Sequence, residues 1–391
     1  MSRFLFVVPP LVGHINPTVG VAAELSRRGH EVAWAGLPDI VAPLVGDGAT
    51  VFRCSSPDLA DPALLRPPSL RGPAALEFLW RRFLGPLAEH MAPGVRAAVR
   101  QFRPDVLVAD QQAVAGGLTA ERLGVVWATS ATTSAGLAPL SGLPGVDSWI
   151  AGRIEELRHR IGNPRGTADP RLSGRLVLAF STEALAGPAA SAAGPVRYVG
   201  PSLASRPAAD DFPWHRLDPR TPTVLITLGT ANAEAGSRFL AACAEAVRGR
   251  PDRAQAVVVD PAGTVPEFAD RVLVRPHVPQ LALLERCDAV ICHGGHNTVC
   301  EALWYGLPLV VAPIRDDQPV IAAQVTDAGA GVRVRFNRAT AGALGAALDT
   351  VLHEPSYREA AGRVRESFRA AGGAAAAATH LEALLVPRPR A

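Results

Sequence analysis

Residues 276–324 read PHVPQLALLERCDAVICHGGHNTVCEALWYGLPLVVAPIRDDQPVIAAQ, and this stretch decides the fold. Two short apolar runs within it, residues 289–292 and 309–312, predict buried strands, and residues 297–305 between them predict a helix. A strand, a helix and a second strand in this order predict two parallel strands joined by a crossover helix.

The same alternation extends through the rest of the chain. It predicts strands at residues 4–8, 31–35, 51–54, 106–110, 125–130, 176–182, 196–199, 223–228, 256–260 and 272–275. It predicts helices at residues 17–28, 74–102, 113–123, 236–248 and 281–286, and helices dominate after the quoted stretch to about residue 386. Residues 201–222 carry five prolines and break the pattern, as a linker would. With 391 residues, the chain is predicted to be an α/β protein of two doubly wound domains, each with a parallel sheet.

The composition excludes several classes of enzyme. All 39 basic residues are arginine, and there is no lysine. Schiff-base and pyridoxal phosphate enzymes, Walker-type NTPases and protein kinases each need a lysine, so these are excluded. The net charge of +3 is small and the arginines are scattered, which predicts neither nucleic acid nor an anionic membrane as a partner.

Cysteine usage and hydropathy predict a cytoplasmic protein. None of the five cysteines forms a C-x-x-C pair, and their number is odd, which is typical of reduced intracellular thiols. No window approaches 18 consecutive apolar residues, so no membrane insertion is expected. Pro9 ends the first apolar run after five residues, too early for a signal peptide.

Ligands of doubly wound sheets bind beyond the carboxyl ends of the strands. Three strand-to-helix junctions in this chain are therefore candidate functional sites. At the first, His14 follows strand 4–8 and precedes a helix expected to be capped by Asn16. A neutral imidazole there can take a proton from a hydroxyl if Asp110, at the end of strand 106–110, holds its other nitrogen. The alternative is that His14 closes a turn and Asp110 caps the next helix.

The second junction, residues 293–298, reads HGGHNT and predicts a diphosphate site. Glycines allow close approach of the backbone, and the free N–H groups of a helix N-terminus attract an anion. Glu301 lies one helical turn after Asn297, within reach of a sugar hydroxyl. Two alternatives remain: an ordinary helix cap, or a metal pair formed by His293 and His296, for which no further ligand lies at a suitable spacing.

At the third junction, Asp317 and Gln318 follow strand 309–312 and form a hydrogen-bonding pair suited to vicinal hydroxyls. The alternative is a helix N-cap near Asp316 or Asp317, with Pro319 in the first turn.

Together these motifs resemble the donor-binding signature of the inverting nucleotide-sugar glycosyltransferases of family one. These include UDP-glycosyltransferases and the antibiotic glycosyltransferases of actinomycetes. The matching residues are Pro279, Gln280, His293, Gly295, Glu301, Gly306, Pro308, Pro313, Asp317 and Gln318. Gly13-His14-x-x-Pro17, Pro104-Asp105 with Asp110, and Leu228-Gly229-Thr230 extend the resemblance over nearly the whole chain.

The resemblance implies the GT-B fold, in which two Rossmann-like doubly wound domains face each other across a cleft and a C-terminal helix crosses back. We therefore expect an acceptor-binding domain at residues 1–201, a linker at 202–222, a donor-binding domain at 223–374 and the returning helix at 375–391.

The resemblance also assigns roles to residues. It implies that His14 is the general base and Asp110 its orienting partner. It implies binding of the donor nucleotide by Gly229, Thr230, His277, Val278, Gln280, His293, Gly295, Asn297, Thr298 and Glu301. Asp317 and Gln318 are expected to bind the transferred sugar. His277 departs from the family pattern, which often has a tryptophan there as a stacking platform for the pyrimidine.

The expected function is metal-independent, inverting transfer of a hexose or deoxyhexose from a TDP-sugar or UDP-sugar to a hydroxyl of a small hydrophobic natural product. The sugar nucleotide is a co-substrate, and no cofactor is expected. A homodimer is left open. The alternatives are a GT-B sugar-nucleotide epimerase and a non-catalytic auxiliary partner of a glycosyltransferase.

Overall fold

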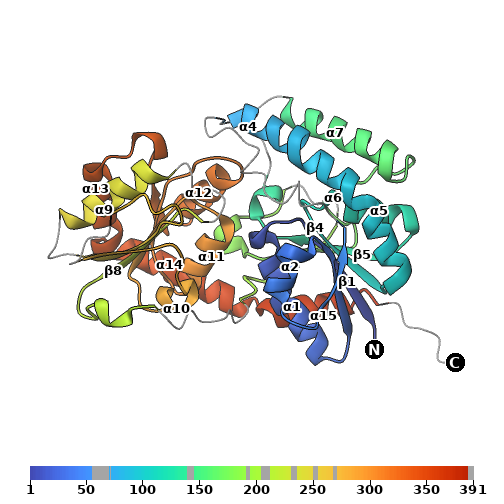
Figure 1. The fold of residues 1–391 in the computed structure, drawn as a ribbon, viewed down its shortest axis with the longest axis horizontal. Helices are drawn as coiled ribbons and strands as arrows, with labels where there is room; N and C mark the ends of the chain where they lie inside the picture. Colours follow the sequence, from blue (N-terminus) through green and yellow to red (C-terminus); the bar gives the residue numbers. More distant parts are fainter. Residues whose placement is uncertain are drawn as a thin grey trace.

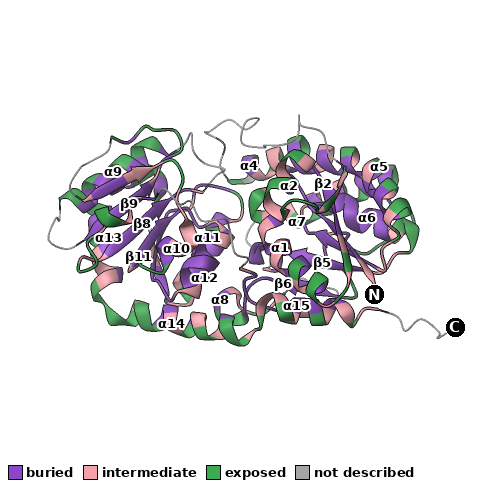
Figure 2. Ribbon diagram, turned by 60° about the horizontal axis from the view of Figure 1, so that its bottom comes forward, coloured by how far each residue is buried: buried purple, intermediate pink, exposed green. Residues whose placement is uncertain are grey.

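The structure is a computed structural model that describes residues 1–54, 70, 72–138, 145–190, 194–203, 212–229, 236–249, 254–266 and 271–385. Two parallel sheets lie side by side, each covered by helices (Figure 1). In Figure 2 most residues of the central strands are buried (purple) and the outer helix faces are exposed (green), so each half has its own buried interior. The predicted architecture of two doubly wound domains, each with a parallel sheet, is confirmed.

The first sheet has seven parallel strands in the order β3-β2-β1-β4-β5-β6-β7. Their bounds are β1 Arg3–Val7, β2 Glu31–Gly36, β3 Thr50–Arg53, β4 Val106–Asp110, β5 Trp127–Ala131, β6 Val177–Ala179 and β7 Val196–Tyr198. β1 pairs with β4 in the register Phe4↔Val106 to Val7↔Ala109, so the carboxyl ends of these two strands meet. This register brings the segments after β1 and β4 to one edge of the sheet.

Alternation along β1 separates two apolar layers. Phe4 and Phe6 face a core shared with α1, whereas Leu5 and Val7 face a core shared with α5 and α6. The helices of this half are α1 Val12–Arg27, α2 Pro38–Val45, α4 Gly72–Phe78, α5 Gly85–Phe102, α6 Val114–Leu123, α7 Val146–Ile161 and α8 Glu183–Ala186, with the short 3₁₀ helix η3 at Ser134–Gly136.

The second sheet has six parallel strands in the order β10-β9-β8-β11-β12-β13. Their bounds are β8 Thr223–Thr227, β9 Gln255–Val259, β10 Val272–Arg275, β11 Ala289–Cys292, β12 Leu309–Val311 and β13 Gly331–Arg333. The helices are α9 Ser237–Arg248, α10 Gln280–Leu284, α11 His296–Trp304, α12 Gln318–Asp327, α13 Ala341–His353 and α14 Pro355–Ala370, with 3₁₀ turns η4 Trp214–Arg216 and η6 Phe336–Arg338. Leu225 packs toward α11 and α12, and its neighbours Val224 and Ile226 pack toward α9 and α13.

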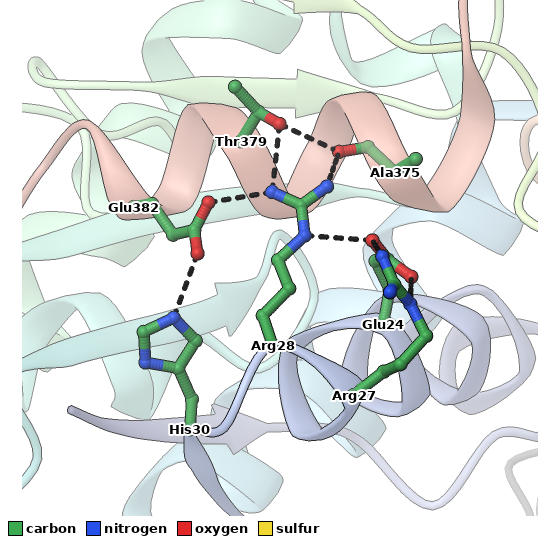
Figure 3. Close-up of polar contacts among 7 residues, drawn as sticks. All are labelled: Glu24, Arg27, Arg28, His30, Ala375, Thr379 and Glu382. Atoms are coloured by element: carbon green, nitrogen blue, oxygen red, sulfur yellow. Dashed lines mark hydrogen bonds and ion pairs between the residues drawn. The ribbon is translucent and has the colours of Figure 1, made fainter. Parts of the chain in front are cut away.

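The last helix, α15 Gly373–Glu382, crosses back to the first half and lies against α1 (Figure 1). Its Ala377, Ala378 and Leu381 belong to the core that contains Phe4. Arg28, which follows α1, donates to Glu382, Thr379 and the Ala375 carbonyl, and the His30 ring pairs with the other oxygen of Glu382 (Figure 3).

Three local predictions were wrong. The helix expected from residue 17 begins at Val12, so Pro17 and Asn16 lie inside α1 and Asn16 is no cap. Strand β13 was missed because three residues carry too little periodicity. The helix predicted at 74–102 is interrupted by a π-helical turn at Leu79–Leu84, where the Gly85 N–H reaches the Trp80 carbonyl and Pro86 has no N–H to offer.

Within the described ranges, no helix is long and apolar enough to cross a membrane.

Candidate active site

A cleft of about 340 Å³ lies between the two halves. Both halves contribute side chains to its walls. The predicted residues that line it are His14, Gly229, Gln280, His293, Gly295, Asn297, Thr298, Glu301, Asp317 and Gln318. The structure thus brings most of the predicted site together in one cavity.

His14 and Asp110 form a hydrogen-bonded pair at the edge where β1 and β4 end. His14 Nδ1 lies 2.9 Å and 3.1 Å from the two carboxylate oxygens of Asp110, and Asp110 itself is buried. The Gln112 N–H donates to the same carboxylate, so Asp110 does not act as a cap for α6, whose N-cap is Ala113. Nε2 of His14 is the ring nitrogen left for a substrate.

Opposing effects act on the pKa of His14. Burial lowers this pKa, but the charge and hydrogen bond of Asp110, with the charge of Asp317, outweigh burial and raise it above its ordinary value. A carboxylate partner that favours the imidazolium makes the ring a stronger base.

The early start of α1 creates a contact across the cleft. Pro17 cannot donate the N–H that would bond the Gly13 carbonyl four residues earlier. That carbonyl instead accepts from Asn297 Nδ2 at 2.8 Å. Asn297, which was expected to face a diphosphate, therefore anchors the turn that carries His14 to the N-terminus of α11.

His293 is buried between two glycines at the end of β11. A Cβ on Gly229 would lie 2.8 Å from its Cε1, and a Cβ on Gly295 would lie 2.5 Å from its Nε2. Burial lowers the pKa of His293 to about 4, with a smaller contribution from the Arg315 charge, and the Thr227 carbonyl acts in the opposite direction. The ring is neutral at pH 7, so one of its nitrogens carries a proton as a donor.

The first turn of α11 contributes more than backbone. Thr298 and Gly295 line the cleft beside His293, and the helix begins at His296. Glu301, one turn further, accepts from Gln280 Nε2 at 2.6 Å. These groups lie together at the cleft, and their binding of an anion and an adjacent sugar hydroxyl stays a prediction.

His296 makes different contacts from His293. Its Nε2 lies 3.2 Å from the Phe180 carbonyl and its Nδ1 lies 3.4 Å from Ser134 Oγ, both in the first half. Burial lowers its pKa to about 4. Among the described residues, no group of three His, Cys, Asp or Glu side chains could hold a metal ion.

Asp317 reaches across to the first half. Its Oδ2 accepts from Thr133 Oγ1 at 2.6 Å, and burial raises its pKa, with the charge of Asp316 adding to the effect. Asp317 occupies the N-cap position of α12 but makes no capping hydrogen bond. Asp316 has a φ of 58°, a left-handed conformation that is uncommon outside glycine.

Gln318 closes the loop before α12. Its Oε1 accepts the backbone N–H groups of Ile314 and Arg315, at 2.8 and 3.0 Å. The loop is thereby held against the cleft at the end of β12.

Among the described residues, two of those predicted to bind the donor nucleotide do not line the cleft. His277 is exposed and Val278 packs partly against the core, and neither lines the cleft. Thr230 lies outside the described residues. Their predicted roles stay predictions.

Several lining residues were missed. Thr132 and Thr133 follow β5, which ends at the same edge as β1 and β4, so the rule that drew attention to Asp110 could have found them. Leu79 and Phe83 reach the cleft from the π-helical turn, which no sequence signal marked.

Comparisons with known proteins identify the family to which the chain belongs. Residues 254–384 match the family model described as "Erythromycin biosynthesis protein CIII-like, C-terminal domain". The chain is 30% identical to demethyllactenocin mycarosyltransferase of Streptomyces fradiae, over 99% of this chain and 87% of the relative. The chain belongs to the family-one nucleotide-sugar glycosyltransferases.

Solved structures of other glycosyltransferases have a similar fold. The glycosyltransferase of kitacinnamycin has a TM-score of 0.76 and 26% identity, covering 98% of this chain and 99% of that chain. The glycosyltransferase VinC, solved in complex with dTDP, has a TM-score of 0.71 and 23% identity, covering 98% and 99%. This chain is therefore a glycosyltransferase of the antibiotic type, which favours that function over the epimerase and auxiliary-protein alternatives.

Proposed function

We propose that this glycosyltransferase moves a hexose or deoxyhexose from a TDP-sugar, or a UDP-sugar, to a hydroxyl of a small natural product, with inversion and without a metal ion. The observation that carries the proposal is the cleft lined by His14 from one half and by His293, Thr298 and Asp317 from the other. A base on one wall and an anion-binding helix on the other are the two groups that a direct displacement needs.

His14 acts as the general base. The acceptor hydroxyl attacks the anomeric carbon while Nε2 of His14 takes its proton, and Asp110 stabilises the imidazolium that forms. General-base catalysis of ~10²–10⁴ corresponds to about 3–5 kcal/mol of the barrier.

The departing diphosphate is stabilised by the N-terminus of α11. Free N–H groups and the helix dipole attract the developing charge, and the neutral ring of His293 and the Thr298 hydroxyl add donors. The chain has no lysine to serve this purpose. Oriented dipoles replace a divalent cation in the proposed mechanism.

We propose that each half of the protein binds one of the two substrates. The donor is proposed to occupy residues 223–374, with Asp317 and Gln318 on the sugar and Gly229, His277, Val278 and Thr230 toward the nucleotide. The complex of VinC with dTDP supports TDP as the nucleotide. The acceptor is proposed to lie against residues 1–201, where Leu11, Val12, Leu79 and Phe83 give the cleft an apolar wall.

Nucleotide binding and turnover test the proposal in two steps. Thermal-shift titrations with TDP and UDP are expected to raise the melting temperature, since ligand at 100 times its Kd stabilises by about 2.7 kcal/mol. Mass spectrometry of reactions with a panel of sugar nucleotides and phenolic or macrocyclic acceptors, with and without EDTA, then detects transfer. The His14→Ala variant is expected to lose transfer and to bind the nucleotide normally. Retained turnover in that variant would contradict the role of His14, and the absence of any thermal shift would contradict the donor site.

A further inference from the structure

Thr132 joins the two members of the base pair. It directly follows β5 and is 3% exposed. Its hydroxyl oxygen lies 2.7 Å from His14 Nδ1 and 2.6 Å from Asp110 Oδ2. One hydroxyl therefore contacts both groups at hydrogen-bonding distance.

The hydrogen-bond directions follow from the chemistry of the three groups. An ionised Asp110 only accepts, so the Thr132 hydroxyl donates its proton to Oδ2. A lone pair of the same oxygen then faces His14 Nδ1, which must carry the hydrogen. Two acceptors, Thr132 and Asp110, thus share the Nδ1–H and leave Nε2 as the unprotonated nitrogen.

The position of Thr132 is fixed from both sides. The preceding strand pairs with β4 in the register Ser130↔Asp110. On the other side, Thr133 donates to Asp317 at 2.6 Å and Ser134 donates to Gln324 at 2.6 Å. The hydroxyl is therefore held between the sheet of the first half and α12 of the second.

We propose that Thr132 is a positioning residue for the general base, whose hydroxyl sets the tautomer and ring orientation of His14 and orients the Asp110 carboxylate. This inference rests on the proposed role of His14. In this proposal Thr132 acts through the His14–Asp110 pair and not on the reacting atoms.

Two substitutions separate the hydroxyl from the shape of the side chain. Thr132→Val keeps the branched shape and removes the hydroxyl, whereas Thr132→Ser keeps the hydroxyl. The valine variant is expected to lose about 10–100-fold in kcat, less than the ~10⁴-fold known when a triad carboxylate is replaced and the tautomer is wrong. The serine variant is expected to stay within about threefold of wild type, because its hydroxyl can make both bonds. The donor KM and the nucleotide Kd are expected to be unchanged in both variants.

Nitrogen-15 NMR of the imidazole gives a readout that packing alone would not change. Wild type and the serine variant are expected to show His14 protonated at Nδ1, and the valine variant a mixture of tautomers. If valine does not fold, as judged by thermal unfolding, Thr132→Ala replaces it in the same comparison.

The outcomes distinguish this inference from the proposed function. Wild-type kcat and tautomer in the hydroxyl-free variant would overturn the inference, as would failure of serine to restore kcat. A raised donor KM with unchanged kcat would also overturn it, because Thr132 would then touch the donor. Retained turnover in His14→Ala contradicts the proposed function itself. If His14→Ala is inactive and Thr132→Val is fully active, the role of His14 as the base stands and only the role of Thr132 is refuted.

Discussion

Gly295→Ala is expected to damage the proposed donor site through a single steric contact. The backbone at Gly295 has φ −64° and ψ 132°, which alanine adopts without strain. The added Cβ would lie 2.5 Å from Nε2 and 2.7 Å from Cε1 of His293. Ordinary contact begins at 3.4 Å, so the ring would have to move by about 0.9 Å.

The ring has little space for that movement. It is buried, and Gly229 also lies close to it, where an added Cβ would be 2.8 Å from Cε1. Overpacking of this kind costs about 1–3 kcal/mol. If the displaced ring no longer meets the diphosphate, the same energy corresponds to a loss of about 5–150-fold in nucleotide affinity.

Isothermal titration calorimetry with TDP and UDP measures this loss, with thermal unfolding run in parallel. Gly152→Ala is the matched control, because Gly152 is an exposed position in α7 where an added Cβ meets nothing within 4 Å. The control is expected to bind nucleotide normally and to gain about 0.5–1 kcal/mol in stability. Wild-type affinity for both nucleotides in Gly295→Ala would refute the assignment of His293 to the diphosphate.

Three other perturbations test the electrostatics and the fold. The charge of Asp110 helps to raise the pKa of His14. Asp110→Asn is therefore expected to lower kcat and to move the acid limb of the pH profile of kcat/KM to lower pH. An acid limb that does not move would argue against the role of Asp110 as the partner of His14. The folded-state pKa of about 4 for His293 and for His296 lies below the ordinary 6.5, so the unfolded chain binds protons first as the pH falls. The contribution of these neutral rings to the free energy of unfolding is fully present above pH 6.5 and is lost as the pH falls toward 4, by roughly 3 kcal/mol for each ring. Urea unfolding at pH 7 and pH 4.5 measures this loss. Thr340→Ala removes the side chain that accepts from the third residue of α13 and is expected to cost about 1 kcal/mol in the free energy of unfolding, with nucleotide affinity unchanged.

Much of the architecture was predictable because buried parallel strands are continuous apolar runs. Val106–Asp110, Val272–Arg275 and Ala289–Cys292 were predicted to the residue. The pairing of β1 with β4, and hence the meeting of His14 and Asp110, follows from strand order, which the alternation pattern does not specify. The positions of both residues at strand ends, together with the resemblance, predicted the pair, and the structure supplied its distances.

Two departures from local rules, at the start of α1 and at Asp317, involve contacts between the two halves. Proline inside α1 costs one helical hydrogen bond, and the loss is offset by Asn297, 284 residues away, which no local propensity can reveal. Asp317 similarly forgoes its capping bond for Thr133. Local rules gave a cap as the expectation at Asn16 and as an alternative near Asp317, but Asn16 lies inside α1 and Asp317 makes no capping hydrogen bond.

The stereochemistry of the product tests the central claim most directly. With an α-linked sugar nucleotide and an acceptor that the enzyme turns over, proton NMR of the purified glycoside gives the configuration of the new bond. Direct attack by a hydroxyl deprotonated at His14 predicts a β-linked product in every turnover. A product that keeps the α configuration would contradict single displacement and with it the role of His14 as the base.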